Sequence, residues 1–258
     1  MKMHELQRRV AAIALCVLVG IQGCDGEAQP LAAADAPPPG RAPTQFVIGV
    51  DNSASRSGQE LQDARALLQN LAATLQPGDR VVFIETFRAG TNLAREWADS
   101  IPALRRPPGM TGGERRRRAD FRDDVAAIAG VFVDSVRSRS STTTDLISTL
   151  WRAADHARAS GGRATTLILL SDMLNSTPEL NMERPDGVPG GDWVARRQAD
   201  GRIPRLDGVC VIAVGAEMKS ARGPRVQAFW DEYLRAAGSG LPVSRFHAMV
   251  SDPGELRC

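Results

Sequence analysis

The chain has few of the residues and patterns that mark common enzyme classes. It contains 4 cysteines, 3 histidines and 1 tyrosine among 258 residues. Neither His156 nor His247 has a histidine, cysteine or acidic partner at zinc-ligand spacing, so we expect both to be structural. We find no Ser-His-Asp order, no nucleophile elbow and no glycine-rich phosphate loop. These absences disfavour zinc enzymes, serine hydrolases and nucleotide-binding enzymes.

The chain also lacks a strong net charge. Its 32 basic and 30 acidic residues give a formal charge of +2, which argues against bulk nucleic-acid binding. Lysine occurs only at Lys2 and Lys219, and we attribute this to a GC-rich genome. The run Arg115–Arg118 lies in a Pro-, Gly- and Arg-rich stretch, 102–118, which we expect to be an exposed insertion. An anion-binding role for these arginines is the alternative.

No apolar run is long enough for a comfortable transmembrane helix. The N-terminus instead carries Lys2, Arg8 and Arg9 before VAAIALCVLVGI, which has the length of a signal-peptide core. The run ends in VGIQGC, which resembles a bacterial lipobox, in which Cys24 is lipidated and becomes the first residue of the mature chain. The alternative is ordinary cleavage near 32–34, which would release a soluble protein.

This N-terminus predicts an exported protein in three parts. Residues 1–23 are the signal peptide, 24–43 a lipidated cysteine with an Ala/Pro-rich tether, and 44–258 one domain. The expected location is the cell envelope, lipid-anchored to a membrane and facing the periplasm or the exterior; the alternative is a secreted or soluble periplasmic protein. Export would also permit a disulfide between Cys210 and Cys258; the alternative is a buried Cys210 and an unpaired Cys258.

Strand and helix patterns alternate along the remainder of the chain. This alternation predicts an α/β fold with a doubly wound, mostly parallel sheet flanked by helices. Strands are expected at 46–51, 80–87, 165–171, 209–215 and 244–250, with a weaker one at 93–97. Helices are expected at 57–76, 119–137, 144–160, 193–199 and 225–237.

The most informative segment is FVIGVDNSAS, at 46–55. An apolar run typical of a buried parallel strand ends at Asp51, and Ser53 and Ser55 follow at alternate positions. The carboxyl ends of such strands open into the crevice where α/β folds bind ligands. Three oxygen ligands there suit a hard divalent cation. The alternative is a simple helix cap, because Asp and Ser also favour that position.

This run resembles DxSxS, the first motif of the metal-ion-dependent adhesion site (MIDAS) in von Willebrand factor type A (VWA) domains. The family's second motif, a threonine that opens a helix, resembles STTTDLISTL and assigns the ligand role to Thr144. Thr142 and Thr143 replace the glycines of that motif, so the choice among the threonines stays open. The third motif is an aspartate after a buried strand. TTLILLSDML resembles it and supplies Asp172, with Met173 in place of the usual glycine.

The resemblance covers roughly 44–250 and implies a VWA-like module that binds Mg²⁺, or Mn²⁺ or Ca²⁺. The implied ligands are Asp51, Ser53, Ser55, Thr144 and Asp172. Such a site leaves the cation under-neutralised, so it attracts an Asp or Glu carboxylate of a partner protein. The alternative is a phosphatase-like hydrolase with Asp51 as nucleophile. That chemistry needs a second acid two residues later, where Ser53 stands, and a suitable lysine, so we expect no enzyme.

The long polar stretch 175–206 follows Asp172 and is expected near the metal end of the sheet. It carries Trp193 beside Arg196 and Arg197, residue types enriched at binding hot spots. We therefore expect these residues to contact the partner. A second aromatic group shares one face of a helix and is expected in the core; it consists of Phe229, Trp230 and Tyr233.

Overall fold

The computed structural model describes residues 42–51, 57–86, 96–101, 111–138, 143–216, 220–239, 245–250 and 252–256. The predictions for Cys24, Ser53, Ser55 and Cys258, and those for the signal peptide and most of the tether, lie outside these residues. Pro37–Cys258 forms one compact unit. Its buried hydrophobic residues run from Phe46 to Leu256, so this unit contains its own core.

The centre of the unit is a six-stranded sheet with the order β3-β2-β1-β4-β5-β6. The strands are β1 (Thr44–Val50), β2 (Arg80–Glu85), β3 (Glu96–Ser100), β4 (Ala164–Leu170), β5 (Val209–Val214) and β6 (Arg245–His247). All neighbouring pairs are parallel except β2 and β3. This is a doubly wound order, and it reverses direction between β1 and β4, where such folds bind ligands. The predicted fold class is confirmed.

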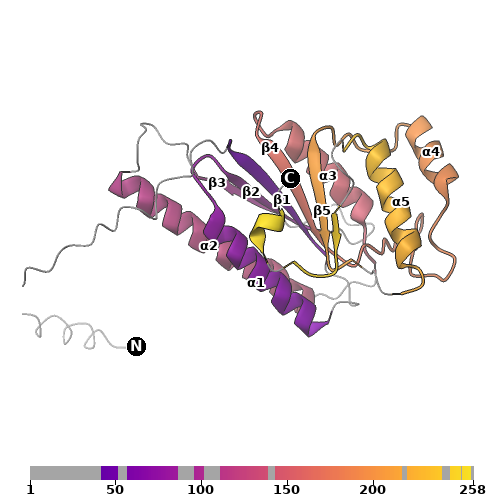
Figure 1. The fold of residues 1–258 in the computed structure, drawn as a ribbon, viewed down its shortest axis with the longest axis horizontal. Helices are drawn as coiled ribbons and strands as arrows, with labels where there is room; N and C mark the ends of the chain where they lie inside the picture. Colours follow the sequence, from indigo (N-terminus) through magenta and orange to yellow (C-terminus); the bar gives the residue numbers. More distant parts are fainter. Residues whose placement is uncertain are drawn as a thin grey trace, which may run out of the picture. The chain divides into compact units, whose positions relative to one another are not determined.

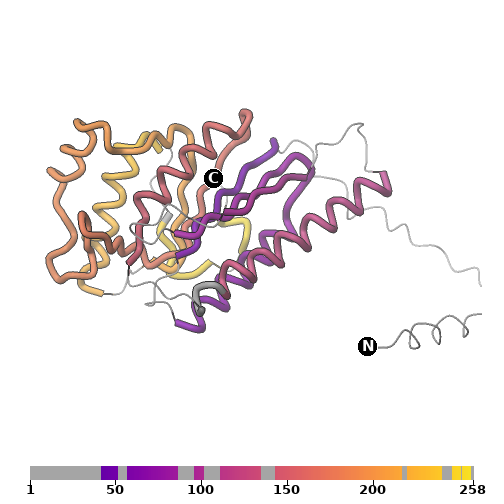
Figure 2. Tube along the Cα trace, turned by 180° about the vertical axis from the view of Figure 1, so that it is seen from behind, coloured from indigo at the N-terminus to yellow at the C-terminus, as the bar shows by residue number. Residues whose placement is uncertain are grey.

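Helices cover both faces of this sheet. They are α1 (Gly58–Thr74), α2 (Gly112–Ser138), α3 (Leu146–Arg158), α4 (Gly191–Ala199) and α5 (Gly223–Ala236), with a short 3₁₀ turn at Pro253–Leu256. Figure 1 shows α1 and α2 side by side on one face. α5 packs in the same hydrophobic cluster as α3, on the other face, and α4 lies next to α5. Figure 2 shows α3 crossing the opposite face.

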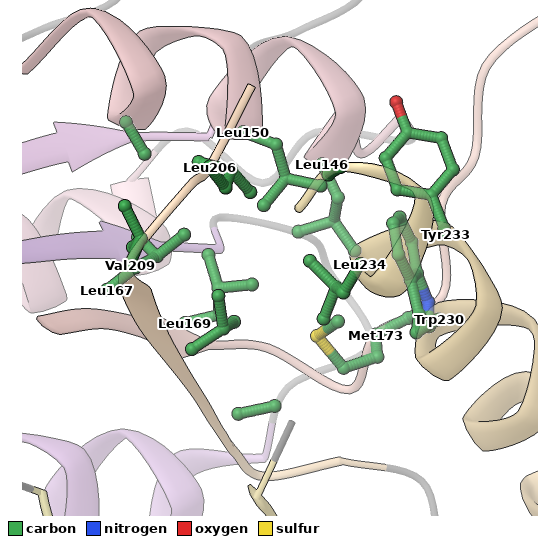
Figure 3. Close-up of a cluster of buried hydrophobic side chains, with 14 of the residues drawn as sticks. Leu146, Leu150, Leu167, Leu169, Met173, Leu206, Val209, Trp230, Tyr233 and Leu234 are labelled. Atoms are coloured by element: carbon green, nitrogen blue, oxygen red, sulfur yellow. The ribbon is translucent and has the colours of Figure 1, made fainter. Parts of the chain in front are cut away.

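Alternation along β1 divides the apolar side chains between two cores. Phe46 and Ile48 belong to the cluster under α1 and α2, whereas Val47 belongs to the cluster under α3 and α5. Side chains of a strand point to opposite faces in turn, so a strand covered on both sides is apolar throughout. Figure 3 shows the second cluster, in which Met173 lies beside Trp230 of α5.

The structure corrects the expected start of the second helix. α2 begins at Gly112, not near 119, so Arg115–Arg118 is helical and not part of a loop. The physical reason is a capping box, since Thr111 N–H donates to Glu114 and Glu114 N–H donates to Thr111 Oγ1 at 3.2 Å. Arginine is also a good helix former.

Smaller differences concern the outer strands. The edge strand extends to Ser100 from Glu96, the first described residue of this region, and Trp97 packs on Phe83 with ring centroids 5.9 Å apart. The last strand ends at His247, earlier than the expected 250. Within the described part of the chain, no helix combines the length and apolar character needed to cross a membrane.

Candidate functional site

Asp51 occupies the switch point of the sheet. It follows β1 directly, and its backbone N–H donates to the Leu170 carbonyl of β4 at 3.0 Å. Its side chain is 0% exposed. Asp51 Oδ1 accepts from Thr144 Oγ1 at 3.3 Å, and Oδ2 accepts from Ser171 Oγ at 2.6 Å. A buried carboxylate is therefore held between two hydroxyl groups from different elements.

Thr144 is fixed by the start of α3. The next residue, Asp145, caps this helix by accepting from Ser148 N–H at 3.0 Å. The Thr144 carbonyl accepts from Ser176 N–H at 2.7 Å, so the segment after β4 returns to this point. Among the threonines considered from sequence, the structure joins Thr144 to Asp51 by a hydrogen bond.

Asn175 strengthens the same junction. Its side-chain oxygen accepts from the Leu146 N–H at 2.9 Å, and its amide donates to the Leu180 carbonyl at 2.9 Å. The side chain is fully buried. Asn175 thus connects the segment after β4 to the first turn of α3, beside Thr144.

Asp172 lies two residues beyond β4 and is half-buried. Its Oδ1 accepts from the Leu174 N–H at 2.9 Å. Between these residues, Met173 has φ +66°, a left-handed conformation that is uncommon for residues other than glycine. The position where the VWA pattern has glycine thus keeps a conformation that glycine favours. Met173 is buried, and its carbonyl accepts from Trp230 Nε1 at 2.8 Å.

Ser171 is a site residue that the sequence reasoning missed. Its hydroxyl donates to Asp51 and accepts from the Met173 N–H at 3.0 Å. The register pairs Val50 with Leu170, so the next residues of β1 and β4 are brought together. The sequence feature that could have indicated Ser171 is its position, because a hydroxyl residue follows the buried strand directly.

The donor set at this edge fits a hard divalent cation. It consists of the carboxylates of Asp51 and Asp172 and the hydroxyls of Thr144 and Ser171, all oxygen donors of the kind Mg²⁺ prefers. Among the described residues there is no cluster of three or more His, Cys, Asp or Glu side chains that could hold a metal. The set therefore depends on hydroxyl groups and is unlike a zinc site.

The expected partner-binding residues lie on α4. Trp193 is half-buried, with its ring centroid 5.5 Å from Phe229 and 6.4 Å from Tyr233. Arg197 lies 4.5 Å over the Trp193 ring, is 9% exposed and forms an ion pair with Glu179. Arg196 is exposed. Trp193 thus joins α4 to α5, Arg197 joins α4 to the segment at Glu179, and Arg196 faces solvent.

A groove of about 490 Å³ lies between α3 and the segment around Glu179. Ile147, Trp151 and Pro178 give it apolar walls, and Arg197 and Glu179 contribute charge. Trp151 is 38% exposed. Asp145, the residue after Thr144, also lines this groove, so the groove begins beside the start of α3. The sequence reasoning missed Trp151.

Two pKa shifts reflect the environment of α4 and α5. A hydrogen bond from Arg202 is the largest cause that holds the pKa of Glu179 below its usual value. Burial raises the pKa of the Tyr233 phenol far above its usual value. The Tyr233 hydroxyl is buried and has no hydrogen-bond partner among the described residues. Of the aromatic group expected in the core, Phe229, Trp230 and Tyr233 are all buried.

The chain matches no family model, and no curated protein matches it. Solved structures resemble it distantly. An aerotolerance-related membrane protein from Bacteroides fragilis is 12% identical with a TM-score of 0.38, over 83% of this chain and 94% of that one. A von Willebrand factor type A structure from Catenulispora acidiphila is 14% identical with a TM-score of 0.41, over 83% of this chain and 40% of that one.

The ArnB paralog VWA2 from Sulfolobus acidocaldarius is 15% identical with a TM-score of 0.37, over 84% of this chain and 43% of that one. The chain thus spans less than half of the two structures named for the VWA domain. We draw no functional argument from likenesses at this level. The case for function depends on the residues of this chain.

Proposed function

We propose that this protein is an exported, VWA-like module that binds a protein partner through a divalent cation at the carboxyl edge of its sheet. The observation that carries the proposal is the Asp51 carboxylate, buried at the switch point between the hydroxyls of Thr144 and Ser171. Asp172 adds a second carboxylate from the neighbouring strand end. This oxygen-rich arrangement is suited to Mg²⁺.

The chain's own residues preorganise the site. Asp51 is held by its backbone bond to Leu170 as well as by its side-chain bonds, so its carboxylate has a fixed position before any ion binds. Thr144 is held by the start of α3. The proposed ligands are Asp51, Thr144 and Asp172, with Ser53 and Ser55 from the first motif. A bound ion would supply positive charge that accepts an Asp or Glu carboxylate of the partner.

Partner selection is assigned to the groove beside α3 and to α4. Arg196 and Trp151 are available as contacts because both are exposed. Trp193 and Arg197 support the groove from behind, since Arg197 lines it and stacks on Trp193. Tryptophan and arginine are enriched among residues that dominate binding energy. In this proposal the ion anchors one carboxylate, and the groove distinguishes among partners.

We further propose that lipidated Cys24 and the tether 24–43 hold the module at a membrane surface of the cell envelope. The mature N-terminus tests this part directly. Mass spectrometry of the purified protein should find Cys24 as the first residue, carrying acyl chains. A mature N-terminus near Asp35 would instead indicate ordinary signal cleavage and a soluble protein.

A binding role is favoured over the hydrolase alternative by the residue that follows Asp51 at the second position. The hydrolase chemistry needs a second acid there, and the chain has Ser53. Assays with a generic phosphomonoester should therefore show no turnover that depends on Asp51.

The partner proposal is tested by capture from an envelope extract. The immobilised protein should retain a partner in Mg²⁺ and release it in chelator, and Asp51→Ala should retain none. Asp120→Ala, which changes an exposed carboxylate on α2, is the matched control and should behave as wild type. Equal capture in chelator, or by Asp51→Ala, would contradict the proposal.

A further inference from the structure

The sheet edge opposite Asp51 contains a cavity of about 390 Å³. It lies where α3 ends and where β4 and β5 begin, and Arg158, Arg163 and Arg205 line it together with Asp207. Arginine is well suited to phosphate, because its planar guanidinium can donate two parallel hydrogen bonds. The composition of the lining therefore indicates an anionic ligand.

The guanidinium groups of these arginines have N–H donors that are not used within the described part of the protein and could bind a ligand. Arg163 donates to the carbonyls of Gly78 at 2.9 Å and Ser160 at 2.7 Å. Arg205 donates to Asp207 at 3.1 Å, and Arg158 pairs with Asp155. Each guanidinium has five N–H donors, so these bonds leave several on each. Asp155 and Asp207 neutralise part of the charge, and Arg163 has no carboxylate partner among the described residues.

The positive surface continues past this cavity around the turn between α1 and β2. The Leu75 carbonyl accepts from Arg118 Nε at 3.2 Å and from Arg122 Nη2 at 2.8 Å. Arg80 begins β2 at the same turn. We call the whole set the arginine edge; it comprises Arg80, Arg118, Arg122, Arg158, Arg163 and Arg205.

The acidic residue nearest this turn is directed inward. Asp79 is 0% exposed, and its carboxylate accepts from the Thr44 N–H at 2.9 Å and the Gln76 N–H at 2.9 Å. The Asp79 carboxylate thus binds backbone N–H groups of the domain and does not face solvent. Arg80, Arg118 and Arg122 around the turn are half-buried, and one exposed acidic residue, Asp99, pairs with Val81 next to Arg80.

The N-terminal part of the chain joins the domain at this same edge. β1 starts at Thr44, whose N–H is bound by Asp79. Pro43 lies against Gly78, since a Cβ placed on Gly78 would be 2.9 Å from Pro43 Cγ. Gly78 in turn bonds Arg163 of the cavity. A tether of this length reaches at most roughly 70 Å, and it would join the membrane to the domain at this edge.

We propose that the arginine edge binds the surface of an anionic phospholipid membrane, with a lipid phosphate in the cavity between Arg158, Arg163 and Arg205. The proposal extends the proposed tethering, because the lipid anchor and the arginine edge would act on the same side of the domain. The edge with Asp51 and Thr144 would then face away from the membrane, toward a partner. A soluble phosphate compound shares this chemistry, and the tether position favours the membrane.

The test is co-sedimentation of Pro37–Cys258 with vesicles. One set contains phosphatidylcholine alone, and the other equal parts of phosphatidylcholine and phosphatidylglycerol, both in chelator so that no metal contributes. Binding is expected only to the anionic vesicles and should weaken as salt rises. Removing one arginine near an anionic surface costs about fivefold in affinity, so Arg158→Gln with Arg205→Gln should lower affinity by about 25-fold.

The matched control is Arg184→Gln with Arg225→Gln. Both side chains are exposed, and Arg225 donates to the Pro185 carbonyl on the side where α5 begins. The net charge changes equally, so this pair should bind within about twofold of wild type. Equal losses in both pairs, or no binding to anionic vesicles, would overturn the proposal.

A second arm separates lipid from soluble phosphate. If inorganic phosphate raised the melting temperature of wild type but not of Arg158→Gln with Arg205→Gln, and vesicles did not bind, the site would be for a soluble anion and the membrane proposal would fail. Circular dichroism checks that each variant is folded. The assay involves neither Cys24 nor the metal, so failure here is distinct from failure of the lipid anchor or of the partner site.

Discussion

Asp51 shows what a single residue can reveal from sequence and what it cannot. Its position after an apolar run predicted the carboxyl end of a buried strand, and the motif order assigned Thr144 and Asp172 to the same site. Ser171 was not predicted, because its contact with Asp51 depends on the register of β1 and β4. Register between strands that are far apart in sequence is set by tertiary packing, which one sequence does not display.

Met173 combines a costly backbone conformation with a buried side chain, and we predict that the side chain matters more. A left-handed conformation costs a residue other than glycine about 1–2 kcal/mol. Truncating a buried methionine costs about 2–5 kcal/mol. Met173→Gly should therefore lower the free energy of unfolding by about 1–3 kcal/mol despite relieving the backbone. Urea denaturation measures this difference. A more stable Met173→Gly would show that backbone strain dominates.

Tyr233 is the chain's single tyrosine, so its ionisation can be followed without interference. Burial raises its pKa in the folded state, while an unfolded tyrosine titrates near about pH 10. The Tyr233 phenol therefore stays protonated to a higher pH in the folded protein than in the unfolded chain. Its contribution to the free energy of unfolding is present below about pH 10 and is lost as the pH rises above it. The tyrosinate absorbance should appear together with loss of structure by circular dichroism. Its appearance near pH 10 in a fully folded protein would contradict the burial of Tyr233.

At the scale of elements, the periodic interiors of helices and strands were predictable and their ends were not. The apolar spacing in α1 predicted a helix at 57–76, and the structure has one at Gly58–Thr74, with Ser57 as its N-cap and not its first residue. The start of α2 was missed because the glycines near 112 suggested a loop, while Thr111 and Glu114 in fact cap a helix. Local side-chain bonds of this kind outweigh composition at a helix terminus.

Cys210 on β5 is disulfide-bonded, and we predict that its partner is Cys258. Leu256 packs in the same core cluster as Cys210, so the end of the chain is held near β5. A disulfide closing this loop would stabilise the protein by roughly 4 kcal/mol in the chain-entropy account. Peptide mapping without reductant should identify the Cys210–Cys258 pair, and reductant should lower the melting temperature. A pair with any other cysteine would exclude this connection.

The groove beside α3 carries a prediction about partner recognition. Trp151 is partly exposed, whereas Trp193 packs on Phe229 and Tyr233. Trp151→Ala should weaken partner binding by roughly 2 kcal/mol, the scale of a hot-spot residue, with an unchanged melting temperature. Trp193→Ala should lower both partner affinity and stability. Calorimetric titration with a purified partner checks both, and unchanged affinity in Trp151→Ala would remove the groove from the mechanism.

At the scale of the whole molecule, the alternation of strands and helices predicted the layered α/β fold, but the strand order required the structure. The order brings Asp51 beside Ser171 at one edge of the sheet, and Arg158, Arg163 and Arg205 together near the tether entry at the other. Residues such as Arg163 and Gly78 are far apart in sequence. Their grouping follows from the fold and could not be inferred from charge runs alone.

The central claim is a divalent-cation site at Asp51, and calorimetric titration of Pro37–Cys258 with Mg²⁺ tests it most directly. We predict saturable binding to the wild type and none to Asp51→Ala. Thr144→Val keeps the side-chain volume but removes the hydroxyl, so it should bind Mg²⁺ more weakly than the wild type. This second variant keeps the test valid if Asp51→Ala does not fold. A ligand at a hundredfold excess over its dissociation constant stabilises a folded protein by about 2.7 kcal/mol, so the wild-type melting temperature should rise in parallel. No heat of binding and no change in melting temperature at millimolar Mg²⁺ or Mn²⁺ would contradict the account.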